Sequence, residues 1–149
     1  MLLNRRNVRI EWGDCDPAGI VFYPRYFAMF DASTSYLFEA AGWKKPDLLR
    51  EFEIVGYPMV DTRAKFIRSS SFGEDIVIET KIAAFRNSSF DVEHRVFKPG
   101  GGDELAIEAF ETRVWVGRHP EIPRRLKSRP IPEVVKRRLS GTEGAPRDV

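Results

Sequence analysis

The sequence predicts an α+β fold in which one long helix packs against an antiparallel sheet. Apolar residues recur at helical spacing between residues 27 and 41, whereas apolar and polar residues alternate in short segments farther along the chain, as they do in half-buried strands. Clusters of glycine, proline, asparagine and serine separate these segments, which is typical of turns between antiparallel strands. An order of one strand, one helix and four strands indicates a sheet wrapped around the helix.

The helix is expected to follow a turn at Pro17 and Gly19, two residue types that favour turns. Gly42 is expected to end it, because glycine readily adopts the left-handed conformation found at many helix ends. Asp31 lies off the apolar face of this helix. The apolar face consists of Phe27, Phe30, Thr34, Leu37, Phe38 and Ala41.

One strand is expected near residues 8–12, before the helix, and a second near residues 59–68. Three more follow, and in the last of them Glu111 and Arg113 alternate with apolar residues, so that both are expected to face away from the core. Turns are expected at residues 69–75, 87–89 and 99–103. The inward residues of the last three strands are expected to be Ile76, Ile78 and Ile82, then Val92, His94 and Val96, and then Phe110, Val114 and Val116.

The composition is that of one globular domain, since the 149 residues are 42% hydrophobic and 31% charged. A chain of this length and hydrophobic content can form a hydrophobic core. No apolar run is long enough to span a bilayer, and residues 1–6 lack the apolar stretch of a secretory signal. We therefore expect a cytoplasmic protein with no membrane partner. The single cysteine, Cys15, excludes an intrachain disulfide framework, and nothing in the sequence indicates a metal site or a cofactor.

The net charge of +2 is too small to argue for a nucleic-acid partner. Positive charge nevertheless gathers between residues 118 and 138, where four prolines interrupt the chain. Aromatic residues do not interleave with these charges, as stacking on bases would require. The plain interpretation is a solvated segment. Its basic residues are Arg118, Arg124, Arg125, Lys127, Arg129, Lys136, Arg137 and Arg138.

Asp16 is the most informative single residue, because it puts a carboxylate in a turn just before the helix. The first N–H groups of a helix have no partner within the helix and carry partial positive charge, so they can bind the oxygen of a polarised carbonyl. A carboxylate beside them can attack the carbonyl carbon or activate a water. Aspartate is also common in turns and as a helix cap, so the residues alone leave both interpretations open.

The segment GDCDPAGIVFYPRYF, residues 13–27, resembles the active-site segment of the hotdog-fold acyl-CoA thioesterases, most closely the 4-hydroxybenzoyl-CoA thioesterase type. The similarity continues through residues 53–80 and the turn at 85–90, and covers roughly residues 8–116. It implies a hotdog thioesterase domain over residues 1–117 and an extension rich in proline and arginine over residues 118–149. The implied reaction is hydrolysis of an acyl-CoA thioester.

The same resemblance implies roles for individual residues. Asp16 matches the catalytic carboxylate of the family, and the backbone N–H near Tyr23 matches the group that polarises the thioester carbonyl. Asp31 matches an aspartate near the phenolic hydroxyl of the substrate. Asp14 matches a first aspartate that is not the attacking group, and we expect its role to be structural.

The turn formed by Arg86, Asn87 and Ser88 matches a turn that contacts the coenzyme in the family. The family's turn carries more positive charge than this one, so any grip on the phosphates would be shared with other arginines. Arginines between residues 118 and 138 could supply it, because arginine matches phosphate geometry in two-point contacts.

The acyl group stays open between hydroxybenzoyl, other aryl and short aliphatic groups. Pro24 stands where related short-chain thioesterases have a histidine, which favours the aromatic branch. Cys15 is a weaker nucleophile candidate than Asp16, because no histidine is placed in the local sequence to activate it. A dehydratase of the same fold would need a histidine and an acid that face each other across the site, and the sequence positions of His94 and His119 do not favour this. A non-catalytic acyl-CoA-binding protein would keep the pocket but would not need an ionised Asp16.

A sheet covered by one helix leaves open edges, which proteins usually pair or cover. We therefore expect an oligomer. The resemblance implies a homodimer with a continuous sheet and two active sites across the interface, which this branch commonly doubles into a homotetramer.

Overall fold

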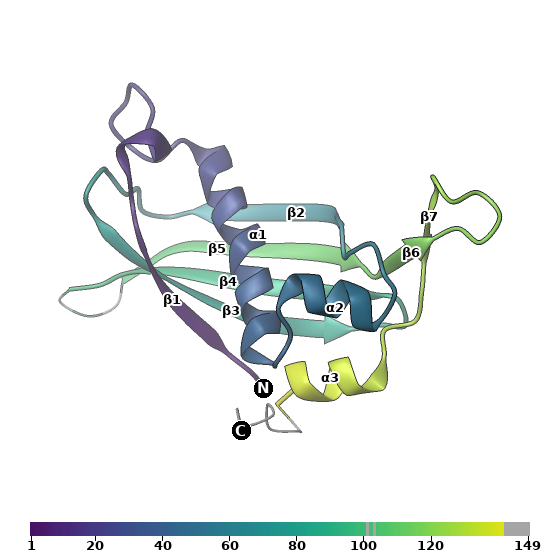
Figure 1. Cartoon of the computed structure of the whole chain (residues 1–149). Helices are drawn as coiled ribbons and strands as arrows, with labels where there is room; N and C mark the ends of the chain where they lie inside the picture. The colour runs from purple at the N-terminus through teal and green to yellow at the C-terminus, as the bar shows by residue number, and fades with distance from the viewer. Residues whose placement is uncertain (101, 103, 142–149) are drawn as a thin grey trace.

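The computed structural model describes residues 1–100, 102 and 104–141. It confirms the α+β class: a five-stranded antiparallel sheet curves around the 18-residue helix α1 (Tyr23–Ala40), which lies across one face (Figure 1). The strands of this sheet are β1 (Asn4–Arg9), β2 (Met59–Phe66), β3 (Asp75–Phe85), β4 (Ser89–Lys98) and β5 (Glu104–Val114). Residues 101 and 103, in the last predicted turn, lie outside the described part.

The sheet has the strand order β1-β3-β4-β5-β2. Hairpins connect β3, β4 and β5 as neighbours, whereas β1 pairs with β3 and β2 pairs with β5, all antiparallel. The strands β1 and β2 are therefore the two edges. The first strand ends earlier than expected, because the chain enters a short 3-10 turn, η1 (Trp12–Asp14).

Helix α1 packs on the sheet through the face that the sequence predicts. Phe30, Thr34, Leu37 and Phe38 are buried, and Gly42 follows with φ 107°, the left-handed conformation expected at the helix end. Within the described residues, no helix is both long and apolar enough to cross a bilayer.

Two short helices and a small sheet were not predicted. They are α2 (Lys45–Glu51), α3 (Glu133–Leu139), β6 (Val116–Arg118) and β7 (Leu126–Ser128), with β6 and β7 paired. Val135 and Leu139 of α3 are fully buried and share a core cluster with Leu37, Phe38 and Trp115. The domain limit placed after residue 117 stays a prediction, but residues 131–139 pack on the core.

The orientation of the second half of β5 was predicted wrongly. Glu111 and Arg113 are buried beneath α1, whereas Phe110 and Val114 lie half-buried on the opposite face of the sheet. A shift of one residue moves every side chain of a strand to the other face. In the structure Ala109 is buried and pairs with the buried His94 of β4. Glu111 and Arg113, two and four residues later, share its face of the sheet.

Replacing Leu139 with alanine should lower the free energy of unfolding by about 2–5 kcal/mol, because it leaves a cavity in the core cluster to which Leu139 belongs. Urea unfolding followed by circular dichroism measures the change. The matched control is Leu126→Ala, at a leucine that is 52% exposed, where the change should be below about 0.5 kcal/mol. Equal losses in the two variants would mean that α3 is not part of the core.

Candidate active site

The loop that carries Asp16 is closed by its own backbone. The N–H of Asp16 donates to the carbonyl oxygen of Ile20 (3.0 Å), and the N–H of Gly19 donates to the carbonyl oxygen of Asp16 (2.9 Å). Gly19 has φ 82°, which favours glycine there. The Oδ1 atom of Asp16 accepts the N–H of Ala18 at 2.8 Å. The carboxylate is thus half-buried and held in one orientation, with part of its hydrogen-bonding capacity used locally.

Asp14 ties this loop to the start of α1. Its Oδ2 accepts the N–H of Glu11 (2.9 Å), and its carbonyl oxygen accepts the N–H of Phe22 (2.8 Å). Phe22 is the cap residue just before the helix. These two hydrogen bonds fit the structural role expected for Asp14. Cys15, the residue between the two aspartates, is half-buried, with its Sγ 3.8 Å from the Glu11 carbonyl oxygen.

The start of α1 has no capping side chain. Phe22 occupies the cap position without a side-chain hydrogen bond, Tyr23 is the first helical residue, and Pro24 follows it. The Tyr23 N–H has no acceptor within the helix, because the first four N–H groups of any helix lack one. A partial positive charge is therefore concentrated at Tyr23, next to the Asp16 loop.

Two cavities lie along α1 and β2. The first, of about 230 Å³, is lined by Ile20, Tyr23 and Tyr26 together with residues 66–70; we call it the entrance pocket. The second, of about 430 Å³, is lined by Phe27, Asp31, Lys45, Tyr57 and Arg113 among others; we call it the Asp31 pocket. Positions 23, 27 and 31 fall on one side of a helix, so both cavities follow the same side of α1.

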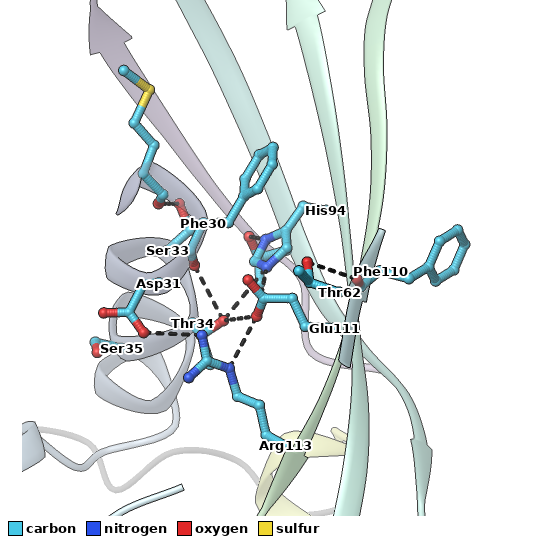
Figure 2. A network of polar contacts seen from close by, with 12 residues as sticks. Phe30, Asp31, Ser33, Thr34, Ser35, Thr62, His94, Phe110, Glu111 and Arg113 are labelled. Atoms are coloured by element: carbon cyan, nitrogen blue, oxygen red, sulfur yellow. Dashed lines mark hydrogen bonds and ion pairs between the residues drawn. The ribbon is translucent and has the colours of Figure 1, made fainter. Parts of the chain in front are cut away.

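Arg113 forms the polar wall of the Asp31 pocket (Figure 2). Its Nη2 donates to Asp31 Oδ1 at 2.9 Å, its Nε to Glu111 Oε2 at 2.9 Å, and its Nη1 to the Tyr57 carbonyl oxygen at 3.2 Å. Asp31, the residue predicted to lie near the substrate hydroxyl, thus lines a cavity and already has a charged partner.

Behind Arg113, polar side chains continue into the core. Glu111 Oε2 lies 3.4 Å from His94 Nε2 and accepts a hydrogen bond of 3.4 Å from the hydroxyl of Thr34. His94 Nδ1 lies 2.8 Å from the hydroxyl oxygen of Thr80, and the His94 ring stacks on Phe30 with 4.8 Å between centroids. His94 is fully buried, as the strand pattern predicts, and belongs to this network.

Glu111 is held in its ionised form. Burial alone would raise the pKa of its carboxyl, but hydrogen bonding and charge attraction from His94 and Arg113 hold the pKa below its ordinary value. Tyr57, in contrast, is kept protonated, because burial raises the pKa of its phenol. Its ring stacks on Phe38, and Lys45 Nζ lies 4.8 Å from the ring centroid. The Asp31 pocket therefore combines a flat aromatic wall with a polar end.

Sequence reasoning missed Glu111, Arg113 and Lys45 as residues that line this cavity. The available signal was that residues 111 and 113 are two apart in a strand, carry opposite charges and share a face. The same spacing and charges are also found in ordinary ion pairs on a protein surface, and for this reason both residues were expected to face away from the core. Tyr57 lines the same cavity.

The structure does not bring the predicted coenzyme turn next to Asp16. The Asp16 loop lies beside the segment that leads into β3, since the N–H of Val21 donates to the carbonyl oxygen of Ser70 at 2.9 Å. The turn at residues 86–88 follows the other end of that 11-residue strand. The two regions therefore lie at opposite ends of the sheet within one chain (Figure 1).

Arg86 is already paired with an internal acid. Its Nη1 and Nη2 donate to the two carboxylate oxygens of Asp91 at 2.9 and 2.6 Å. This hydrogen bonding raises the pKa of Arg86 and lowers the pKa of Asp91. The backbone of the turn is anchored too, because the carbonyl oxygen of Ser88 accepts the N–H of Trp115 at 2.7 Å. A phosphate at this turn would compete with Asp91 for Arg86.

We expect Glu111→Gln to lower the free energy of unfolding at pH 7 by about 3–5 kcal/mol, because it leaves Arg113 buried without its carboxylate. The folded pKa of Glu111 is depressed, so its contribution is present above the unfolded value of about 4.5 and is lost as pH falls through the lower folded value. The difference from wild type should therefore shrink below about pH 4.5.

Urea unfolding at neutral pH and at several acidic pH values measures this difference. Glu108→Gln, on the same strand but half-buried on the opposite face, is the matched control and should change stability little at any pH. A wild-type advantage over Glu111→Gln that stayed constant down to about pH 3 would contradict the assignment.

Comparison with known proteins agrees with this architecture. A family model described as the thioesterase-like superfamily matches residues 10–139. A curated relative, the 4-hydroxybenzoyl-CoA thioesterase of Pseudomonas sp. strain CBS-3, is 40% identical over 112 residues, which is 72% of this chain and 78% of that protein.

Solved structures show the same similarity. The structure of the Pseudomonas 4-hydroxybenzoyl-CoA thioesterase has a TM-score of 0.83 and 34% identity, covering 93% of this chain and 99% of the other. A mutant 4-hydroxybenzoyl-CoA thioesterase in complex with 4-hydroxybenzoyl-CoA has a TM-score of 0.85 and 33% identity, with the same coverage. A gentisyl-coenzyme A thioesterase has a TM-score of 0.74 and 28% identity, covering 92% and 99%. The chain therefore belongs to the thioesterase-like superfamily and is a thioester hydrolase with the hotdog fold.

Proposed function

We propose that this protein hydrolyses an aryl-CoA thioester such as 4-hydroxybenzoyl-CoA to the free acid and coenzyme A. The observation that carries the proposal is a half-buried carboxylate, Asp16, fixed in a loop hydrogen-bonded to the uncapped start of α1. The relatives named above, which act on aryl-CoA thioesters by their names, support the substrate class.

In the proposed reaction the thioester oxygen accepts the N–H of Tyr23, where the helix start stabilises the developing negative charge. Losing one such donor typically costs about 10²–10³ in rate. Asp16 then attacks the carbonyl carbon to form a mixed anhydride that water hydrolyses, or it takes a proton from a water that attacks directly. In both routes the C–S bond breaks, water supplies the new acid oxygen, and coenzyme A leaves as the thiol.

The Asp31 pocket is the proposed site of the aryl group. Phe27 and Tyr57 offer apolar walls, and Asp31 provides an acceptor for a hydroxyl at the far side of the ring. Arg113 contacts Oδ1 of Asp31, so the other oxygen, Oδ2, is the proposed acceptor. A short aliphatic group would fill the same cavity without using Asp31, which makes the substrate profile the test between the two branches.

We further propose that the active unit is at least a homodimer, joined through the edge strand β2. Several apolar residues are exposed along this edge and just beyond it, namely Met59, Val60, Phe66 and Ile67. Two copies paired edge to edge about a two-fold axis run antiparallel. Each entrance pocket, at the end of β2, would then lie beside the partner's Asp31 pocket, at the start of β2. The coenzyme turn of one copy would likewise approach the Asp16 loop of the other.

The coenzyme is proposed to contact the turn formed by Arg86, Asn87 and Ser88, with help from the basic segment between residues 118 and 138. Ile131, within that segment, lies beside the turn, since its N–H donates to the carbonyl oxygen of Asn87 at 2.8 Å. This backbone contact supports a coenzyme site shared by the two parts of the chain.

Asp16→Asn should reduce kcat for 4-hydroxybenzoyl-CoA by about 10²–10⁴, the usual contribution of a positioned base, because asparagine keeps the shape but cannot act as nucleophile or effective base. Release of free thiol from a panel of aryl and aliphatic thioesters measures it. Asp14→Asn is the matched control, since asparagine can still accept the Glu11 N–H, and it should lose less than about tenfold. High residual activity in Asp16→Asn would favour Cys15 or the binding-protein interpretation.

Arg86→Ala should raise KM about two- to fivefold, the effect of an exposed charge pair of about 0.5–1 kcal/mol, with little change in kcat, because a remote phosphate is held about equally in ground and transition states. The rise should shrink at high salt and vanish for the dephospho-CoA thioester. Asp91→Asn, which removes the charge that competes for Arg86, should not raise KM. A KM that is the same for both coenzymes in wild type would disprove the phosphate contact.

Sedimentation equilibrium at micromolar concentration should show a dimer or tetramer. Val60→Lys, at an exposed position of β2, should shift the population towards monomer and lower activity together, because like charges would meet across the two-fold axis. The control Leu3→Lys, at a leucine that is 47% exposed and lies outside β2 and outside both cavities, should leave the mass unchanged. Monomeric wild type with full activity would rule the dimer out.

A further inference from the structure

A buried ion pair reaches from the core to the surface of the Asp31 pocket. The side chains of Glu111 and Arg113 are only 1% and 4% exposed, whereas Asp31, the third member, is 58% exposed. Figure 2 shows Arg113 between the two acids, with Asp31 on α1 and Glu111 on β5. One guanidinium thus links the interior of the protein to an acid that faces the cavity.

Stability alone is a poor reason to keep such a pair. Taking two charges out of water carries a large desolvation penalty, and apolar residues of similar volume often stabilise a fold as well or better. The exposed part of the network, Arg113 with Asp31, would contribute little on its own, as surface ion pairs do. This part of β5 lies directly under α1, where apolar side chains would otherwise be expected.

The geometry restrains both partners of the exposed pair. Arg113 donates through all three of its nitrogen atoms, to Glu111, to the Tyr57 backbone and to Asp31, so its planar group cannot rotate. Glu111 is itself fixed by Thr34 and His94. Because Arg113 takes Oδ1 of Asp31, the rotation of that carboxylate is fixed as well. In the described residues no hydrogen bond or ion pair engages Asp31 Oδ2.

We propose that Arg113, anchored by Glu111, is a positioning residue for substrate specificity: it holds Asp31 so that one carboxylate oxygen accepts the distal hydroxyl of the aryl group. This inference rests on the proposed function and assigns the orienting role to a residue that does not itself contact the hydroxyl. It also assigns a purpose to the buried charges, because Glu111 balances Arg113 from behind and leaves Asp31 free to serve the substrate.

The test compares kcat/KM for 4-hydroxybenzoyl-CoA with kcat/KM for benzoyl-CoA. Wild type should prefer the hydroxylated substrate by about ten- to a hundredfold, the usual cost of leaving a polar site unpaired. Asp31→Ala should bring this ratio close to 1. Arg113→Lys keeps the positive charge beside Glu111 but cannot reach three acceptors with one nitrogen, so the ratio should fall at least about fivefold. In each of these variants the rate with benzoyl-CoA should fall less than the rate with 4-hydroxybenzoyl-CoA.

A double variant gives a second test of the positioning role, and a variant elsewhere in the sheet serves as the control. The double variant Glu111→Gln with Arg113→Gln removes both buried charges while keeping polar side chains of similar size, and should lose the preference in the same way if Arg113→Lys folds poorly. Arg95→Lys is the matched control, because Arg95 lies on a neighbouring strand of the same sheet in a cavity with Glu79 and Glu93, away from the Asp31 pocket. Its ratio should equal that of wild type. Thermal unfolding confirms that each variant is folded.

The outcomes separate this inference from the function on which it rests. A preference that is lost in Asp31→Ala but kept in folded Arg113→Lys and in the double variant would overturn the positioning role alone. Wild type that shows no preference for the hydroxylated substrate would overturn hydroxyl recognition and this inference together. Loss of the preference in the Arg113 variants through a selective fall in the rate with 4-hydroxybenzoyl-CoA supports the proposal, since a merely structural defect would lower both rates alike.

Discussion

The contact between α1 and the inner face of the sheet is the constraint on which the other features depend. Phe30, Leu37 and Phe38 bury the apolar side of the helix, and their packing fixes where the helix begins and which side stays accessible. The same contact covers Glu111 and Arg113, so that a polar network lies within an otherwise apolar layer. One helix thus positions an uncapped end near Asp16 and an acid, Asp31, two turns farther on.

Local sequence patterns made much of the fold, and one residue of the candidate site, predictable. The α1 face, the glycine that ends it and the antiparallel hairpins follow from residue spacing and turn residues, and Asp16 stood out because its position before a helix has a chemical use. The phase of β5 did not follow, since a strand with charges on one face and apolar residues on the other can be read either way until its partners are known. Glu111 and Arg113 are buried because they pair with each other and with groups on α1 and β4, which sequence spacing does not reveal.

The short helices were missed for a related reason. α3 is seven residues long and carries Lys136, Arg137 and Arg138 in its last turn, so its composition resembles a solvated segment. Its burial rests on two residues, Val135 and Leu139, too few for a periodic signal. Arg86 and Asp91 are only five residues apart, so the sequence is compatible with a pair between them. An arginine in a turn is equally compatible with binding an external phosphate.

The first N–H groups of α1 lack the side-chain cap that most helices have. Most helices begin with a serine, threonine, aspartate or asparagine whose side chain satisfies the first N–H groups, and losing such a residue costs about 1 kcal/mol. This helix has Phe22 there and no side-chain hydrogen bond. A conventional cap would stabilise the folded chain but would occupy the position of the thioester oxygen in the proposed reaction. The protein thus leaves its longest helix incomplete, and the substrate would complete it as a transient cap for the duration of each turnover.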